Sequence, residues 1–260
     1  MHISLIGCGN MGEAILAGLH QKHMFHIVEA RPERRQVLKT KYRCTFVDIA
    51  HAVDSAEIII LAVKPQDLSA VLEELSAQSL KAKLVISIAA GITTSFIEKA
   101  LKQSARVVRV MPNLPAVIKE GVTGITKGAK AGSEDIKKAV DLFSAVGETV
   151  VVKEEMIDAV TAVSGSGPAY VFLFVECMMK AAMKLGFKEK EAKALVYKTL
   201  TGSAHMLAAS DDSAEELRAK VTSKGGTTQA ATDVFMQKDI VGVYEKALQA
   251  AKKRAAELSQ

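Results

Sequence analysis

The sequence predicts an α/β fold in two parts, in which a doubly wound sheet covered by helices precedes an all-α second half. The first half alternates short β-branched runs, from HISLI to RVVRVM, with stretches of helical spacing, which is typical of βαβ units and a parallel sheet. After Pro168 the chain has no proline and is rich in Ala, Leu, Met, Lys and Glu, which favours helices. We therefore expect one domain at residues 1–152 and a second, helical domain at residues 153–260.

Composition and charge narrow the class of protein. With 49% hydrophobic and 24% charged residues among 260, the chain has the balance of a globular protein. Its net charge of +5 comes from scattered lysines and arginines, so we expect affinity for small anionic molecules and no nucleic-acid partner. Three cysteines, Cys8, Cys44 and Cys177, have no CxxC spacing, which argues against a disulfide framework or a zinc site. We expect no metal.

The apolar stretches predict a cytoplasmic homodimer without a membrane partner. The N-terminal MHISLIGCGNMG runs directly into an apolar strand and a glycine turn, unlike a signal peptide. The stretch at residues 170–183 is short for a membrane span and contains Glu176 and Lys180. Because it is apolar on nearly every face of a helix, we expect a second subunit to cover it.

The motif GCGNMG predicts a dinucleotide site of the Rossmann type. It follows the strand ISLI and precedes the helical EAILAGL, the context that this fingerprint needs. Gly7 would allow a tight turn, Gly9 would let the backbone approach a pyrophosphate, and Gly12 would let the helix pack closely on the strand. The alternative is a purely structural glycine turn. We expect the whole loop to contact the cofactor: Gly7, Cys8, Gly9, Asn10, Met11 and Gly12.

The second strand leaves the choice between NADH and NADPH open. In HIVEARPERR, Glu29 could accept a hydrogen bond from a ribose 2′-hydroxyl, whereas Arg31, Arg34 and Arg35 could bind a 2′-phosphate. Arg34 and Arg35 fit a solvated helix face equally well. The arginines favour NADPH, with NADH as the alternative.

Two later strands end in motifs at the expected cofactor crevice, because loops at the carboxyl ends of parallel strands line it. These motifs are AVKPQ, with Val63, Lys64 and Pro65, and MPN, with Asn113. Lys64 could equally be an ordinary surface lysine, and Asn113 could donate to the ribose or the nicotinamide region. The following GVTGIT is rich in turn residues, and a polar helix near residues 133–144 and a strand ETVVV come after it.

Two polar stretches in the C-terminal half lead into helices. They are TAVSGSGPAY at residues 161–170 and TSKGGTTQA at residues 222–230, and we interpret both as loops that present N–H groups to an anion. Simple helix connectors are the alternative. Capping boxes are expected at Ser95 with Glu98 and at Ser213 with Glu216.

Together these motifs resemble the pyrroline-5-carboxylate reductase family over essentially the whole chain. The resemblance rests on GCGNMG, AVKPQ, MPN, DAVTAVSGSGPAY and TSKGGTT, in that order. It implies hydride transfer from NAD(P)H to the C=N carbon of Δ1-pyrroline-5-carboxylate, which gives L-proline in the last step of proline biosynthesis. It also implies an interlocked dimer, which could assemble further as a pentamer of dimers.

The family pattern also implies roles for single residues. Thr161 would hydrogen-bond the ring nitrogen. The substrate carboxylate would be held by Ser223, Gly226, Thr227 and Thr228. Lys224 departs from the pattern, which has proline before the paired glycines.

Two other functions compete with this one. A β-hydroxyacid dehydrogenase has a lysine in a GxGxxxK arrangement, but here Gly165 and Gly167 place Val171 at that position. A non-catalytic module that senses NAD(P) would keep GCGNMG without needing the two C-terminal loops.

Overall fold

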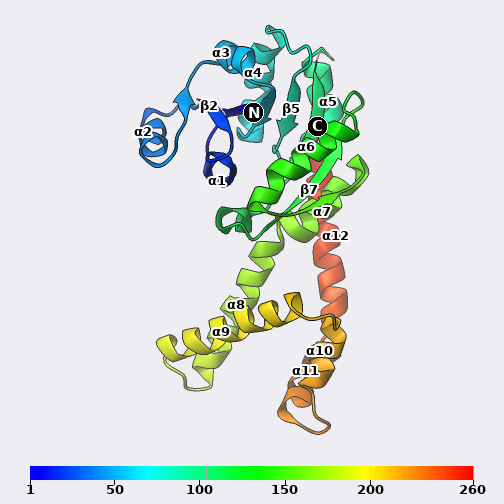
Figure 1. Ribbon diagram of the computed structural model, residues 1–260. Helices are drawn as coiled ribbons and strands as arrows, with labels where there is room; N and C mark the ends of the chain where they lie inside the picture. The colour runs from blue at the N-terminus through cyan, green and yellow to red at the C-terminus, as the bar shows by residue number, and fades with distance from the viewer. Residues whose placement is uncertain (103–104, 260) are drawn as a thin grey trace. The chain divides into compact units, whose positions relative to one another are not determined.

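The computed structural model describes residues 1–102 and 105–259, and within them eight strands form one sheet (Figure 1). The strand order is β3-β2-β1-β4-β5-β6-β7-β8. Strands β1 to β6 are parallel as predicted, whereas β7 runs antiparallel to β6 and β8 runs parallel to β7. The strands are β1 (His2–Ile6), β2 (Met24–Val28), β3 (Thr45–Phe46), β4 (Ile58–Leu61), β5 (Leu84–Ser87), β6 (Arg106–Met111), β7 (Gly121–Lys127) and β8 (Gly147–Val151).

Helices cover both faces of this sheet, which confirms the doubly wound Rossmann-type fold. Alternate residues of each strand enter opposite cores: Leu5 packs with helices α1, α2 and α6, and Ile6 with α3, α4 and α5. The strand order reverses between β1 and β4, so the crevice at their carboxyl ends is where such a sheet binds its ligand. The helices are α1 (Asn10–Leu19), α2 (Pro32–Lys41), α3 (Ile49–Ser55), α4 (Pro65–Ser76), α5 (Thr94–Ala100) and α6 (Ser133–Phe143), with 3₁₀ turns at Leu114–Ile118 and Ser144–Val146.

The stretch GVTGIT is the strand β7, and its prediction as turns was wrong. Its glycines serve close packing instead. A Cβ atom on Gly121 would lie 2.8 Å from Cα of Ala116, and one on Gly124 would lie 2.7 Å from Cγ1 of Val160. Both distances are too short for a side chain, so glycine is needed where the strand meets its neighbours.

The stretch SGSGPAY is helical, and its prediction as a loop was also wrong. A 3₁₀ turn at Glu154–Met156 leads into α7 (Ile157–Val160), a π-helical turn at Thr161–Gly165 and α8 (Gly167–Lys184). The run Glu154–Lys184 is therefore 31 residues long, and by length and composition it could cross a membrane. The sequence expectation rested only on residues 170–183, which are short for a membrane span. The helical run is longer because it begins well before that apolar stretch.

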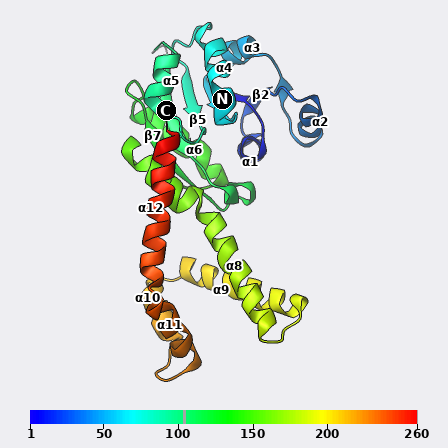
Figure 2. The ribbon, with the colours of Figure 1, turned by 180° about the vertical axis from the view of Figure 1, so that it is seen from behind.

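Contacts divide the chain into two units. The first comprises Met1–Pro168 and Ala250–Gln260, and the second comprises Ala169–Gln249. The chain thus leaves the first unit within one helix and returns to it in another. Figure 2 shows the end of α12 (Ile240–Leu258) beside α5. The next residue, Ser259, donates its hydroxyl to Asp158 of α7 at 3.3 Å.

The second unit is all-α, as predicted. Besides most of α8 and α12 it contains α9 (Glu189–Ala208), α10 (Ala214–Lys220) and α11 (Thr227–Gln237). Of its residues, all of which the structure describes, only Ala192 and Val196 are buried. Phe172 and Leu173 on α8 are each more than half exposed, as expected for helices that a second subunit covers.

One of the two predicted capping boxes is confirmed. Ser213 accepts a hydrogen bond from the Glu216 N–H, and the Glu216 carboxylate accepts one from the Ser213 N–H. The other is wrong, because α5 begins at Thr94 and the Thr93 hydroxyl caps it by accepting from the Phe96 N–H. The N-cap of this helix is thus Thr93, two residues before the serine that the sequence pattern predicted.

Candidate cofactor and substrate sites

The glycine loop after β1 has the geometry that a dinucleotide needs. Gly7 has φ +84°, and a Cβ there would lie 2.7 Å from Cγ1 of Val63. A Cβ on Gly12 would lie 2.9 Å from the Gly7 carbonyl oxygen, so this glycine lets α1 pack against the loop. At Gly9 a Cβ would meet no protein atom within 4 Å. The space beside Gly9 is therefore open for a ligand to approach the backbone.

Arg34 holds this loop in place. Its guanidinium donates to the Cys8 carbonyl at 2.8 Å and to the Gly9 carbonyl at 3.3 Å, and it pairs with the Glu13 carboxylate. Arg34 is therefore neither a solvated helix residue nor free to bind a phosphate. By engaging the carbonyl groups, it leaves the N–H groups at the start of α1 for an anion.

Glu29 lies at the end of β2 with its carboxylate fully engaged. It is 4% exposed and accepts from the Cys8 N–H at 3.1 Å, the Arg31 N–H at 3.0 Å and the Arg31 guanidinium at 2.9 and 3.0 Å. Burial alone would raise the pKa of this carboxyl, but these hydrogen bonds outweigh burial and lower the pKa. Glu29 is thus charged at neutral pH and is the anchor of Arg31.

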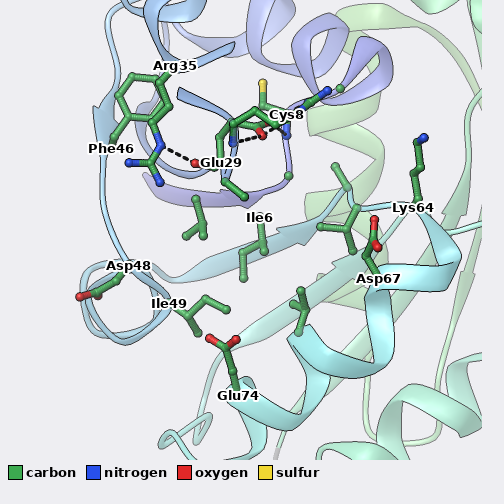
Figure 3. Close-up of a pocket in the computed structure, with 18 of the residues that line it drawn as sticks. Ile6, Cys8, Glu29, Arg35, Phe46, Asp48, Ile49, Lys64, Asp67 and Glu74 are labelled. Carbon is green, nitrogen blue, oxygen red and sulfur yellow. Dashed lines mark hydrogen bonds and ion pairs between the residues drawn. The ribbon is translucent and has the colours of Figure 1, made fainter. Parts of the chain in front are cut away.

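A pocket of about 1070 Å³ opens at the carboxyl ends of β1, β2 and β4 (Figure 3). Six predicted cofactor residues line it, namely Gly7, Cys8, Gly9, Arg31, Val63 and Lys64. Figure 3 shows that the other walls come from the end of β3 and the residues after it, with Phe46, Asp48 and Ile49, and from α4, with Asp67 and Glu74. Its volume and its position at the strand reversal suit a dinucleotide.

Two groups of lining residues were missed by the sequence reasoning. Phe46 ends β3 and Asp48 and Ile49 follow it, while Gln66 and Asp67 lie in the first turn of α4, so their position at strand ends was the available signal. Arg35 also lines the pocket, where its side chain donates to the Glu29 carbonyl.

The remaining predicted cofactor residues are not in this lining. Asn10, Met11 and Gly12 form the first turn of α1, and Pro65 is the first residue of α4. Asn113 is buried after β6, where its side chain bonds to two backbone groups.

Thr161 lies at the start of the π-helical turn. Its hydroxyl donates to the Ile157 carbonyl at 2.8 Å, so its oxygen lone pairs remain to accept a hydrogen bond. Its own carbonyl accepts from the Ser166 N–H at 2.8 Å, across five residues, which defines the wide turn. Such turns interrupt α-helices frequently at functional sites.

The SKGGTT segment lies in the second unit, before α11. Gly225 has φ +73° and donates its N–H to the Gln229 side chain at 2.7 Å, and the Gly226 N–H donates to the Ser223 carbonyl at 3.0 Å. Ala230 donates to the Gly226 carbonyl, so the N–H groups of residues 227–229 lie at the open start of the helix. These backbone groups can bind an anion.

Among the described residues, no group of three or more His, Cys, Asp or Glu side chains is placed to hold a metal ion. A Rossmann-type sheet with an open glycine loop, an arginine-rich pocket and a helical second part defines the class of this protein. It is an NAD(P)-dependent oxidoreductase.

Comparison with known proteins identifies the family. Residues 154–258 match the family model described as pyrroline-5-carboxylate reductase dimerisation, and residues 2–91 match the one described as NADP oxidoreductase, coenzyme F420-dependent. The pyrroline-5-carboxylate reductase of Pseudomonas aeruginosa is 38% identical over 264 residues, which cover 99% of this chain and 97% of that protein. The chain belongs to the pyrroline-5-carboxylate reductase family.

Solved structures agree with this assignment. A pyrroline-5-carboxylate reductase from Coxiella burnetii has a TM-score of 0.92 at 36% identity, with 99% of this chain and 98% of that chain covered. The pyrroline carboxylate reductase of Plasmodium falciparum, solved with NADP bound, has a TM-score of 0.85 at 26% identity, with 100% and 98% covered.

Proposed function

We propose that this protein reduces Δ1-pyrroline-5-carboxylate to L-proline with NAD(P)H, in the last step of proline biosynthesis. The observation that carries the proposal is similarity to a curated reductase of this name over 99% of the chain, glycine loop and helical half included. When bound, NAD(P)H supplies the hydride, so the chain itself must bind, orient and exclude water. In functional terms, residues 1–152 bind the cofactor and residues 153–260 bind substrate and form the dimer.

The pocket favours NADPH over NADH. The two carboxylate oxygens of Glu29 are occupied by Arg31 and the Cys8 N–H, so they are poor acceptors for a ribose hydroxyl. The Arg31 side chain is 55% exposed and can bind a 2′-phosphate without releasing Glu29. Arg35 lines the same end of the pocket. The P. falciparum relative with NADP bound supports this choice.

The glycine loop holds the pyrophosphate, with Asn10, Met11 and Gly12 contributing the first turn of α1. Val63 and Lys64 line the crevice beyond it, and Pro65 begins α4 directly after them. We propose no direct cofactor contact for Asn113, because its Oδ1 and one Nδ2 hydrogen are engaged by backbone groups and it does not line the pocket.

Thr161 binds the ring nitrogen as an acceptor. Its hydrogen is given to the Ile157 carbonyl, so its oxygen can receive a hydrogen bond from a protonated C=N nitrogen. The protonated form is the better hydride acceptor, because the positive charge makes the neighbouring carbon more electrophilic. Thr161 thereby selects and orients the reactive form of the substrate.

The carboxylate of the substrate binds at the SKGGTT segment. Thr227 and Thr228 offer N–H groups and hydroxyls at the start of α11, and Gly226 precedes them with the Ser223 hydroxyl against it. The helix dipole and the charge on Lys224 both favour an anion there. The carboxylate is thus the group by which the second unit recognises the substrate.

The second unit forms a homodimer, and further assembly into a pentamer of dimers is part of this proposal. The family model that matches residues 154–258 is described as dimerisation, and the exposed apolar helices need a cover. A second copy of the chain, not a membrane, is that cover for Glu154–Lys184. We place the protein in the cytoplasm, without a nucleic-acid partner.

Turnover assays with purified protein test this function. NADPH oxidation should require Δ1-pyrroline-5-carboxylate and should not occur with β-hydroxyacids or their oxo forms. Thr161→Val should lower kcat/KM by roughly 10-fold or more, because it removes a hydrogen bond to a charged group. Thr161→Ser, which keeps the hydroxyl, is the matched control. An inactive wild-type protein that binds NADPH would instead favour a sensing module.

A further inference from the structure

Asn113 is a buried residue whose side chain joins three parts of the first unit. It is 8% exposed and follows β6 by two residues. Its Nδ2 donates to the Ser164 carbonyl at 3.2 Å, and its Oδ1 accepts from the Val122 N–H on β7 at 2.9 Å. The amide therefore connects the end of β6, the start of β7 and the π-helical turn at Thr161–Gly165.

Pro168 removes one donor that the Ser164 carbonyl would have in a regular helix. In an α-helix this carbonyl would accept from the N–H four residues later, and that residue is Pro168, which has none. A proline ring also crowds the carbonyl four residues before it, and the wide turn relieves this. Asn113 supplies the donor that Pro168 cannot.

The same turn carries the proposed catalytic hydroxyl. Thr161 begins it, and the Thr161 carbonyl accepts from Ser166. The turn lies directly on the sheet, since a Cβ on Gly165 would be 2.7 Å from Cε of Met111, just before Pro112 and Asn113. Packing holds the turn against β6, but hydrogen bonding must fix which carbonyl faces which donor.

We propose that Asn113 is a positioning residue, which rests on the proposed role of Thr161 in substrate binding. By donating to the Ser164 carbonyl, it fixes the π-helical turn and hence the direction of the Thr161 hydroxyl. Without that donor the Ser164 carbonyl loses its hydrogen bond to the sheet, and the turn is free to shift. A displacement of about 1 Å at a substrate-binding group can cost about 100-fold in rate.

A double-mutant cycle between Asn113→Ala and Thr161→Val tests this proposal. In the wild-type background, Asn113→Ala should lower kcat/KM for Δ1-pyrroline-5-carboxylate by roughly 10- to 100-fold. The Kd for NADPH, from fluorescence titration, should change by less than about 2-fold. In the Thr161→Val background the same change should cost little more, because the group that Asn113 positions is gone.

A rescue variant tests the physical reason. Pro168→Ala gives the helix its own N–H for the Ser164 carbonyl, so Asn113→Ala should cost much less activity in that background. If Asn113→Ala does not fold, Asn113→Asp goes through the same experiments. It keeps the size and the acceptor for Val122 but removes the donor to Ser164.

The possible outcomes distinguish failure of this proposal from failure of the proposed role of Thr161 in substrate binding. Unchanged kcat/KM in Thr161→Val would refute the role of Thr161, and this proposal with it. A normal loss in Thr161→Val with an equal Asn113 effect in both backgrounds would refute this proposal alone. A parallel rise in the Kd for NADPH would also overturn it, because Asn113 would then act on the cofactor. The proposal would also be refuted if Asn113→Ala lowered kcat/KM as much in the Pro168→Ala background as in the wild type.

Discussion

Replacing Gly9 with alanine should weaken cofactor binding without destabilising the fold. Gly9 has φ −71° and ψ −160°, which alanine adopts readily, and its added Cβ would meet no protein atom within 4 Å. The stability of Gly9→Ala should therefore match the wild type or rise by up to about 1 kcal/mol, since alanine restricts the unfolded chain. The methyl group would occupy the space through which a pyrophosphate reaches the loop.

The loss in affinity follows from the contacts that this methyl group blocks. A hydrogen bond to a charged group contributes about 1.5 to 3 kcal/mol. Losing one of them should weaken NADPH binding by roughly 10- to 150-fold, at about 1.4 kcal/mol per factor of ten. Fluorescence titration gives the Kd for NADPH, and thermal unfolding without cofactor gives the stability.

Gly12→Ala is the matched control in the same loop. Its Cβ would lie 2.9 Å from the Gly7 carbonyl oxygen, so backbone must move, and unfolding should become easier by about 1 to 3 kcal/mol. A Gly9→Ala protein that binds NADPH as tightly as the wild type would refute this reading of the loop. So would a Gly9→Ala protein as unstable as Gly12→Ala.

Four further outcomes are expected. Thr228→Ala should lower kcat/KM for the substrate by roughly 10- to 150-fold with the Kd for NADPH unchanged; a change in the cofactor constant alone would contradict the carboxylate role. Arg31→Ala should reduce the preference for NADPH over NADH, and an unchanged ratio of kcat/KM values would exclude Arg31 from phosphate binding. Cys8 should resist alkylation at about pH 8, because burial raises the pKa of its thiol to about 12; mass spectrometry showing labelled Cys8 in the folded protein would contradict this. Without detergent the protein should sediment as a dimer or larger, and a stable folded monomer at micromolar concentration would contradict the dimer.

Strand and helix order could be predicted because each element has a local signal. Leu5 and Ile6 alternate between two cores, and helices with glycine or proline at their first turn follow strands. The glycines of β7 were misread because a glycine needed for close approach looks the same in sequence as one needed for a turn. Only the position of Val160 beside Gly124 distinguishes them.

The motifs of the site could be predicted from the sequence, but the hydrogen-bond partners of its side chains could not. The sequence presents Arg31, Arg34 and Arg35 as equivalent, yet Arg34 binds the glycine loop and Arg31 binds Glu29. Arg34 meets carbonyl groups 26 and 25 residues earlier in the chain, and no local pattern distinguishes it from its two neighbours. The π-helical turn was missed for a similar reason, since its donor, Asn113, lies far along the chain from Ser164.

The return of the C-terminal residues to the first unit bears on how the chain folds during synthesis. The Ser259 hydroxyl bonds to Asp158, 101 residues earlier, and a Cβ on Gly91 would touch the Leu258 carbonyl at 2.7 Å. The ribosome releases residues 250–259 only after the entire second unit has emerged. The first unit, although most of it is encoded before the second, is therefore completed after it, and a nascent chain carries an unfinished surface there until residues 250–259 are made.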